Sequence, residues 1–233
     1  MVLASLSLAV AALYLLSPIA FAAPNPNAGT IVNLRIEGRS HTIFEGPVFT
    51  RGHNVTTASA GTIHCDGTNH GINPEPGPTA TTALDDAASI HGFTWDGTPF
   101  TGFDDIFVTS IGGDTQTTTE FWGILLAFEF TPVGGCQQRV KLGDHLLWAF
   151  DAFSKAHFLK LDGPHTARRN KSITLTVTDG ATGSPIAGAT ANGQTSDENG
   201  HIVVTFDDVG LKGVKAEKPD SIRSNRLDIV VLP

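Results

Sequence analysis

Positive charge is scarce in this sequence of 233 residues. Lysine and arginine together number 15 against 23 aspartates and glutamates, which gives a formal net charge of −8. A protein that binds nucleic acid or an anionic membrane needs an excess of basic residues, because these neutralise phosphate groups. The composition therefore argues against both partners, and no basic patch along the chain points the other way.

Long apolar runs are missing from most of the chain. Beyond residue 23, no segment approaches the roughly 20 consecutive apolar residues of a membrane span. The beginning is the exception, because residues 1–16 are uncharged and apolar and the small-residue stretch 20–23 follows. This order is typical of a secretory signal peptide with an A-x-A cleavage site. We predict a signal peptide over residues 1–22 and a mature protein that is secreted or held at the cell surface.

Cysteine occurs only twice, at Cys65 and Cys136. In an oxidising compartment such a pair is expected to form a disulfide. His64, Asp66 and His70 surround Cys65 and form the densest group of potential metal ligands. However, a disulfide would consume the thiolate, and no second pair of ligands completes a tetrahedral set. We therefore predict a Cys65–Cys136 disulfide, no metal site and no cofactor.

Catalytic motifs are also missing. The sequence has no G-x-S-x-G elbow, no H-E-x-x-H, no P-loop and no G-x-G-x-x-G after a strand. Adjacent acidic pairs such as Asp104 and Asp105 point to opposite faces of a strand, which suits solvated strand ends better than shared acid/base chemistry. We predict no catalytic residue and a binding or adhesion protein. A secreted hydrolase acting on an extracellular polymer and a structural wall or matrix component are the alternatives.

The first part of the chain predicts strands and one helix. Residues 31–37 alternate between apolar and polar side chains, and residues 42–48 can pair with them. Residues 61–79 are rich in Gly, Asn and Pro and predict a long irregular loop. A helix follows, with Thr82 as its cap and Gly92 at its end. Further strands are predicted over residues 106–110, 121–130 and 146–150.

The sequence pattern changes near residue 154. Beyond this point, short runs that alternate between apolar and polar residues are separated by Asx-Gly turns. This spacing is typical of a β-sandwich, and no helix is expected there. We predict two domains, over residues 30–153 and 156–233. The runs comprise residues 157–161, 172–178, 189–191, 201–206, 213–218 and 227–232.

The second half resembles bacterial immunoglobulin-like domains of the invasin/intimin type. The resemblance implies a spacer or adhesion module. It rests on the order and spacing of Val177-Thr178-Asp179, residues 183–189 (GSPIAGA), residues 195–200 (TSDENG) and Arg223-Ser224-Asn225.

The first half resembles the transcobalamin C-terminal-like family, whose members are secreted or surface proteins. The pieces that carry this resemblance are residues 32–37, Ile43-Phe44-Glu45-Gly46, the helix after a Pro-rich loop, Phe121-Trp122-Gly123 and residues 141–150 (KLGDHLLWAF). In vitamin B12 carriers this domain closes over a ligand held by a helical-barrel domain, for which this sequence shows no counterpart. No cobalamin-binding residue is therefore inferred. Together the two resemblances imply an α+β N-terminal β-grasp-like domain followed by an all-β immunoglobulin-like sandwich.

The predicted ligand surface combines the loop over residues 61–79 with the segment 93–103, which we expect to be irregular. Aromatic side chains exposed on a rigid scaffold suit the binding of sugars or peptides. The candidate residues are His64, His70, Trp95, Phe100 and Phe103. The expected partner is an extracellular glycan, a small molecule or a protein.

Two sequons, beginning at Asn54 and Asn170, are candidate glycosylation sites. Such a modification requires an exposed asparagine on a secreted chain. We therefore expect both side chains to lie at the surface.

Overall fold

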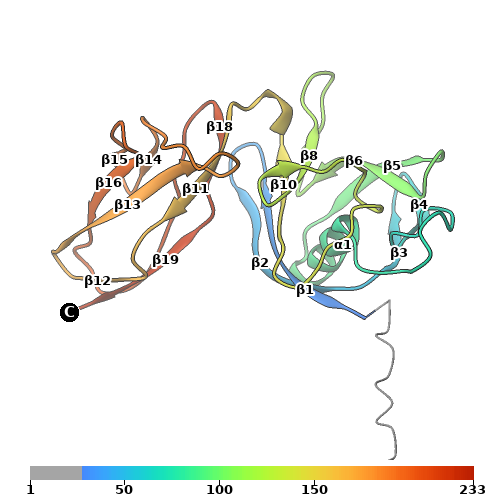
Figure 1. Ribbon diagram of the computed structural model, residues 1–233, viewed down its shortest axis with the longest axis horizontal. Coiled ribbons are helices and arrows are strands. Elements are labelled where there is room, and N and C mark those ends of the chain that lie inside the picture. Colours follow the sequence, from blue (N-terminus) through green and yellow to red (C-terminus); the bar gives the residue numbers. More distant parts are fainter. Residues whose placement is uncertain (1–27) are drawn as a thin grey trace, which may run out of the picture.

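The computed structural model describes residues 28–233, so the predicted signal peptide over residues 1–22 lies outside the described part. The described chain is mostly β-strand, and α1 (Ala80–His91) is the one α-helix within it. Figure 1 shows two groups of strands side by side, here called the N-terminal half (28–151) and the C-terminal half (157–233). The short 3-10 helix η1 (Ala152–Ser154) lies between them. No helix among the described residues is long and apolar enough to cross a membrane.

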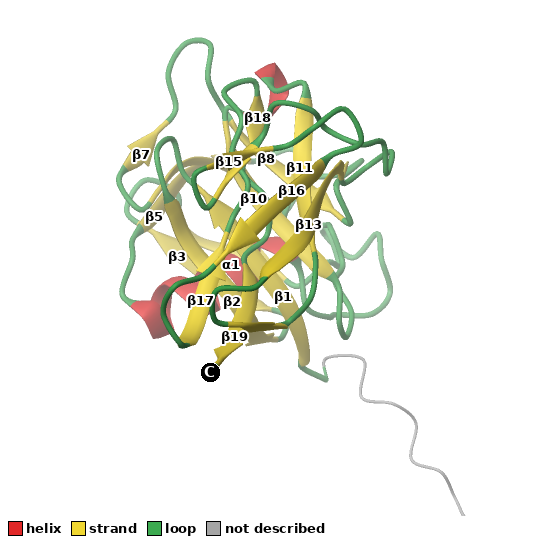
Figure 2. Ribbon diagram, turned by 90° about the vertical axis from the view of Figure 1, so that its left-hand side faces the viewer, coloured by secondary structure: helices red, strands yellow, loops and turns green. Residues whose placement is uncertain are grey.

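The largest sheet of the N-terminal half has the strand order β2-β1-β10-β8-β9. β1 runs parallel to β10, and the other neighbouring pairs are antiparallel. Val32, Leu34 and Ile36 of β1 are buried at alternate positions and share one apolar cluster with Leu84 of α1. One face of the sheet therefore packs against the helix, as the turned view in Figure 2 also indicates. The strands are β1 (Thr30–Glu37), β2 (Thr42–Thr50), β8 (Trp122–Leu126), β9 (Glu129–Phe130) and β10 (His145–Phe150).

Two smaller sheets complete the N-terminal half. β3 and β4 form an antiparallel hairpin, and β5, β6 and β7 form a three-stranded sheet. Two predictions of irregular structure are therefore wrong, because residues 61–65 and 95–100 belong to strands whose backbone groups pair with a neighbour. The strands are β3 (His53–Thr57), β4 (Gly61–Cys65), β5 (Trp95–Phe100), β6 (Asp105–Ile111) and β7 (Asp114–Thr115).

The C-terminal half contains a four-stranded sheet, β16-β13-β11-β18, a three-stranded sheet, β12-β19-β17, and the pair β14-β15. Leu175 and Val177 of β13 share one buried apolar cluster with Ile229 and Val231 of β19, so the two larger sheets enclose a common core. The strands are β11 (His157–Asp162), β12 (Thr166–Arg168), β13 (Ser172–Asp179), β14 (Thr190–Ala191), β15 (Gln194–Thr195), β16 (His201–Thr205), β17 (Gly210–Val214), β18 (Ser221–Ile222) and β19 (Leu227–Leu232).

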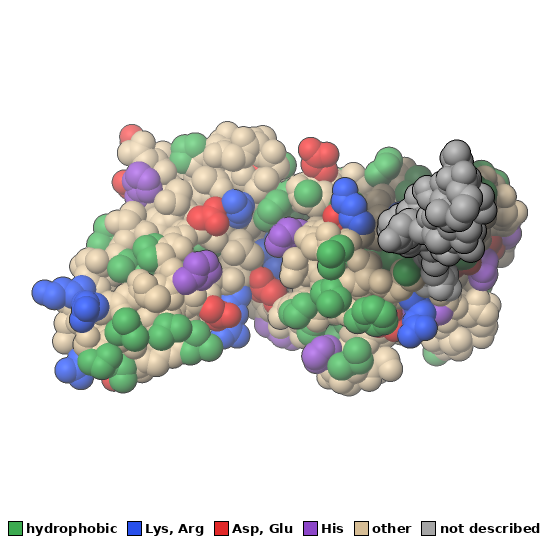
Figure 3. Space-filling model, turned by 60° about the horizontal axis from the view of Figure 1, so that its bottom comes forward, with side chains coloured by type: hydrophobic (Ala, Val, Ile, Leu, Met, Phe, Trp, Pro, Cys, Tyr) green, Lys and Arg blue, Asp and Glu red, His purple; other side chains and the backbone are tan. Residues whose placement is uncertain are grey.

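The outer face of β17 and β19 carries exposed apolar side chains. Leu211 and Val230 are partners in the register of these strands, and both are exposed. Figure 3 shows hydrophobic side chains gathered at the surface of this half.

The predicted fold class is wrong. In place of an α+β β-grasp-like domain followed by an all-β immunoglobulin-like sandwich, the described chain is broadly all-β and made of several small sheets. The sequence pattern emphasised one clear helix, which is only 12 residues long, and it predicted irregular structure for residues 61–65 and 95–100, which are paired strands. The domain limits at residues 30–153 and 156–233 stay a prediction.

The N-cap of the helix lies three residues before the predicted cap, Thr82. Thr79 is the N-cap, and its Oγ1 accepts a hydrogen bond from the backbone N–H of Thr82 at 3.2 Å. Thr82 Oγ1 in turn accepts from the N–H of Thr79 at 2.9 Å, which completes a capping box. Gly92 ends the helix as predicted, with a left-handed φ of 76° that glycine adopts without steric cost.

The strand predicted over residues 121–130 is a hairpin. β8 and β9 pair antiparallel, with Leu125 opposite Phe130, and the chain turns at Ala127 and Phe128. These two residues adopt φ values of 50° and 69°, which is unusual for residues other than glycine, asparagine and aspartate. The Phe128 ring packs on Gly180 of the C-terminal half, and a side chain on residue 180 would overlap the ring. This contact compensates the unfavourable backbone conformation of the turn.

An apolar cluster and a polar network join the two halves. The apolar cluster contains Leu125 and Leu147 from one half and Phe158 and Ile222 from the other. It is continuous with the Phe128 contact, so the tip of the β8–β9 hairpin belongs to the boundary between the halves.

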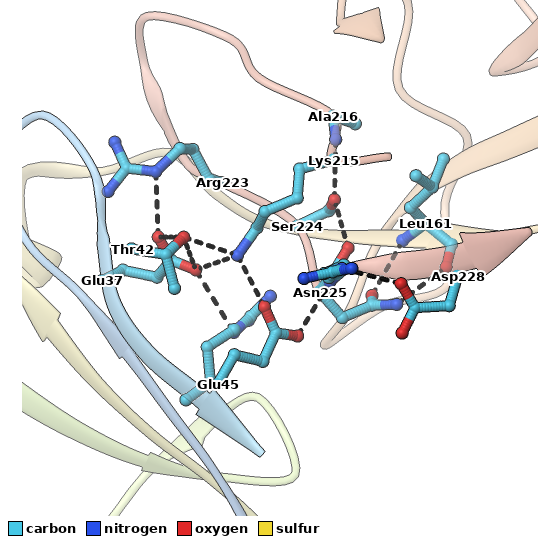
Figure 4. A network of polar contacts seen from close by, with 12 residues as sticks. Glu37, Thr42, Glu45, Leu161, Lys215, Ala216, Arg223, Ser224, Asn225 and Asp228 are labelled. Carbon is cyan, nitrogen blue, oxygen red and sulfur yellow. Dashed lines mark hydrogen bonds and ion pairs between the residues drawn. The ribbon is translucent and has the colours of Figure 1, made fainter. Parts of the chain in front are cut away.

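The polar network centres on Glu37, which is 1% exposed (Figure 4). Arg223 Nε lies 2.9 Å from Glu37 Oε2, and Lys215 Nζ contacts both Glu37 Oε1 and Glu45 Oε2. A buried carboxylate requires such partners, because its desolvation is otherwise uncompensated. The network therefore ties β1 and β2 to the C-terminal half.

Candidate binding site

A cavity of about 470 Å³ opens beside β6 and β8 in the N-terminal half. Its walls come from the turn between β5 and β6, from the hairpin strand β9, and from residues 131–137. The volume falls within the range typical of small-molecule sites. Seven aromatic residues line it, and we call it the aromatic cavity: Phe100, Phe103, Phe107, Trp122, Phe130, Trp148 and Phe153.

Four of these rings form two stacked pairs. Phe100 and Phe103 lie parallel with centroids 5.6 Å apart, and Phe130 and Phe153 lie nearly parallel at 4.8 Å. All four side chains are exposed, by 42% to 65% of their surface. Local structure fixes the first pair, because the Phe103 N–H donates to the Phe100 carbonyl at 2.9 Å and closes the turn. Exposed apolar rings around a hollow are more typical of a binding surface than of a core.

Asp105 is the one ionisable residue that lines the cavity. It is 5% exposed, so the prediction of a solvated strand end is wrong for this residue. Its Oδ1 accepts hydrogen bonds from the N–H groups of Ile106 at 2.9 Å and Cys136 at 3.0 Å, and Oδ2 accepts from Gln137 Nε2 at 3.2 Å. Burial raises the pKa of Asp105, and these hydrogen bonds partly oppose the rise.

The wall at residues 134–136 is shaped by its small residues and by the disulfide. A side chain on Gly134 would overlap Asp105 Oδ2, and one on Gly135 would overlap Thr81 Oγ1, so the backbone can approach both groups only without a Cβ. The predicted disulfide between Cys65 and Cys136 is confirmed and buried. It fastens this wall to the end of β4.

The predicted surface residues are only partly brought together. Phe100 and Phe103 line the aromatic cavity. Trp95 does not, because its half-buried ring packs against the core and its Nε1 donates to Asp85 Oδ1 at 2.9 Å. His64 and His70 lie beside the cavity's edge, where both meet Asp104, the neighbour of Phe103.

The contacts of Asp104 hold two segments distant in sequence against each other. His70 Nδ1 lies 2.9 Å from Asp104 Oδ1, and the His70 N–H donates to Asp104 Oδ2 at 2.6 Å. His64 bridges Asp104 at 3.5 Å and Asp66 at 3.0 Å. The loop over residues 61–79 therefore contacts the residue that follows the segment 93–103, and a ligand surface formed by the two segments stays a prediction. Among residues 28–233, no group of three or more His, Cys, Asp or Glu side chains is arranged to hold a metal ion.

The two candidate glycosylation residues lie at the surface. Asn54 is an exposed residue of β3, and Asn170 is exposed in the turn before β13, with φ of 60°. Modification of either residue stays a prediction.

Sequence reasoning missed Phe130, Phe153 and Asp105. Phe130 was expected in the core because its strand seemed continuous, and the turn at residues 127–128 instead brings it to the cavity. The sequence offers a usable signal only for Asp105, which lies two residues beyond the predicted ligand segment 93–103.

A second cavity, of about 460 Å³, lies where the two halves meet. Its lining mixes positive and negative side chains, among them Arg39, Glu120, Lys155 and Lys218. Arg39 Nη1 and Glu120 Oε1 are already paired at 2.7 Å, so part of this charge is internally satisfied.

Comparisons with known proteins found little similarity. No protein-family model matches the sequence, and no curated protein matches it. Among solved structures, a crystal structure of haptocorrin in complex with Cbi is similar over 56% of this chain, with 14% sequence identity and a TM-score of 0.36. The match spans 26% of the haptocorrin chain. A similarity at this level supports no conclusion about fold or function, and the resemblance to transcobalamin-like domains stays an expectation.

Proposed function

We propose that this protein is an extracellular binding protein that takes up a small, ring-containing molecule in the aromatic cavity. The observation that carries the proposal is the pair of exposed ring stacks, Phe100 with Phe103 and Phe130 with Phe153, around one hollow. Flat faces of this kind stack on ligand rings and remove apolar surface from water. The disulfide and the apolar segment at residues 1–16 support an oxidising, extracellular location.

The cavity favours binding over turnover because its lining is mainly apolar and its one carboxylate among the described residues is already engaged in three hydrogen bonds. Asp105 is thus held in place as a fixed feature of the wall. In this proposal the C-terminal half supports or spaces the cavity and contributes no ligand contact of its own.

The test uses indole, an uncharged aromatic probe, with binding followed by ligand-observed nuclear magnetic resonance. Phe103→Ala and Phe153→Ala each remove one ring of a stack and should weaken indole binding by at least about fivefold. Phe49→Ala is the matched control, because Phe49 is 51% exposed on β2 and lies outside the cavity. Indole binding that is absent, or equally strong in all four proteins, contradicts the proposal. Consumption of the compound at catalytic protein concentration favours an enzyme instead.

A further inference from the structure

The aromatic cavity combines two features that together indicate the charge of its ligand. Its lining is rich in aromatic rings, and the negative face of an aromatic π system attracts cations within about 6 Å of the ring centroid. Among residues 28–233, its one ionisable lining residue is a carboxylate, and no lysine, arginine or histidine of that range lines it. Both features favour positive charge at the same place.

Asp105 lacks a cationic partner among residues 28–233. No ion pair involves it, and its hydrogen bonds come from two backbone N–H groups and the amide of Gln137. The buried carboxylate of Glu37 differs in this respect, because it forms ion pairs with both Lys215 and Arg223. A buried carboxylate without a counter-charge is destabilising, and a bound cation would compensate it.

The carboxylate keeps capacity for a ligand. Each oxygen accepts up to two hydrogen bonds, and Oδ2 has only the Gln137 amide at 3.2 Å. Oδ2 occupies the space that a side chain at position 134 would fill, so Gly134 allows the carboxylate to lie against the cavity wall. Burial also raises the pKa of Asp105, which agrees with a carboxylate that lacks a counter-charge.

We propose that the aromatic cavity binds an organic cation, with an ammonium group held between the aromatic faces and the carboxylate of Asp105. The inference rests on the proposed function, because it specifies the ligand class of the same cavity. It distinguishes the ligand from neutral and anionic ring compounds, for which Asp105 offers no attraction.

The experiment compares choline with 3,3-dimethylbutan-1-ol, in which a carbon atom replaces the ammonium nitrogen at nearly equal size and shape. Wild-type protein should bind choline about tenfold more tightly than the alcohol. Asp105→Asn preserves the shape and an accepting oxygen, and it should reduce this preference severalfold while indole binding stays within about twofold. Asp162→Asn is the matched control, because it removes the same charge at an exposed site in the other half.

The outcomes separate the two proposals. If wild-type protein binds indole but binds choline no better than the alcohol, the cation inference is wrong and the proposed function stands. If it does not bind indole, the proposed function fails. If Asp105→Asn disturbs the cavity and abolishes indole binding, the variant Phe103→Leu is tested in its place. Leucine keeps the apolar contact of the phenylalanine but removes its π face. An unchanged preference for choline in Phe103→Leu overturns the aromatic part of the inference.

Discussion

Removing the Cys65–Cys136 bond should destabilise the protein and loosen the aromatic cavity. The two cysteines are 71 residues apart, and the chain-entropy estimate for a loop of that length is about 4 kcal/mol at 25 °C. The double variant Cys65→Ala/Cys136→Ala also loses the packing of two fully buried sulfur atoms. For a chain of this size the unfolding midpoint should fall by roughly 10 °C or more.

Calorimetry of the oxidised wild type, the reduced wild type and the double variant separates these contributions. The reduced wild type lacks the bond but keeps both sulfur atoms, so its loss of stability measures the cross-link alone. The Cys136 N–H donates to Asp105 Oδ1 at 3.0 Å, and loosening the wall should therefore also weaken indole binding. The reasoning is refuted if reduction lowers the free energy of unfolding by less than about 1 kcal/mol.

Three further predictions concern single residues. Glu37→Gln leaves two cations without their buried carboxylate and should cost about 3 kcal/mol in chemical denaturation. Gly134→Ala forces a methyl group onto Asp105 Oδ2 and should cost about 1–3 kcal/mol in the same assay, with weaker choline binding. His53 Nε2 lies 3.4 Å from Asp86 Oδ1, and this carboxylate raises the pKa of His53 above 6.5. The stabilisation is therefore fully present below pH 6.5 and is lost as the pH rises through the folded-state pKa. Thermal stability should therefore fall between about pH 6 and 8, and His53→Gln should flatten part of that slope.

The predictions for Glu37 and Gly134 each have a matched control. Glu120→Gln breaks the solvent-exposed pair with Arg39 and should cost less than about 1 kcal/mol. Gly113→Ala adds a methyl group where no atom lies within 4 Å, although the φ of 92° at this position introduces backbone strain. Both glycine variants can therefore lose stability, and weaker choline binding is expected only for Gly134→Ala. A Glu37→Gln variant as stable as Glu120→Gln would show that the buried network contributes nothing beyond a surface pair.

Strands with one buried face were predictable because their pattern follows directly from burial. Residues 31–37 alternate in sequence, and β1 covers residues 30–37 with Val32, Leu34 and Ile36 inside. Gly92 was equally readable, since a left-handed C-cap strongly favours glycine. The disulfide followed from the number of cysteines alone.

Strands stabilised mainly by pairing were not predictable. β5 reads Trp-Asp-Gly-Thr-Pro-Phe and buries only Gly97 fully, so its residues give no alternating signal. Position 97 requires glycine, because a Cβ there would overlap Ile106 on the paired strand. Strand preference depends on such neighbours more than on the residues themselves, which is why the segment seemed irregular.

The cavity was hard to predict for the same physical reason. Phe130 belongs to a run of apolar residues that indicates a buried central strand, and only the turn at residues 127–128 reverses the chain and exposes it. Asp104 and Asp105 are neighbours that point to different surroundings, one toward two histidines and the other into the cavity. Sequence adjacency shows that their directions differ, but it does not show which of them is buried.

The C-terminal half supports the cavity wall through the β8–β9 hairpin. Phe128 at the hairpin tip packs on Gly180, while Phe130 two residues later faces the cavity and also meets Phe158 of β11 edge to face, with centroids 5.5 Å apart. The left-handed backbone at Ala127 and Phe128 is unfavourable by itself, so the contacts across the boundary stabilise it. Because one short turn connects both contacts, weakening the boundary should shift Phe130 and change ligand affinity without altering any residue that lines the cavity.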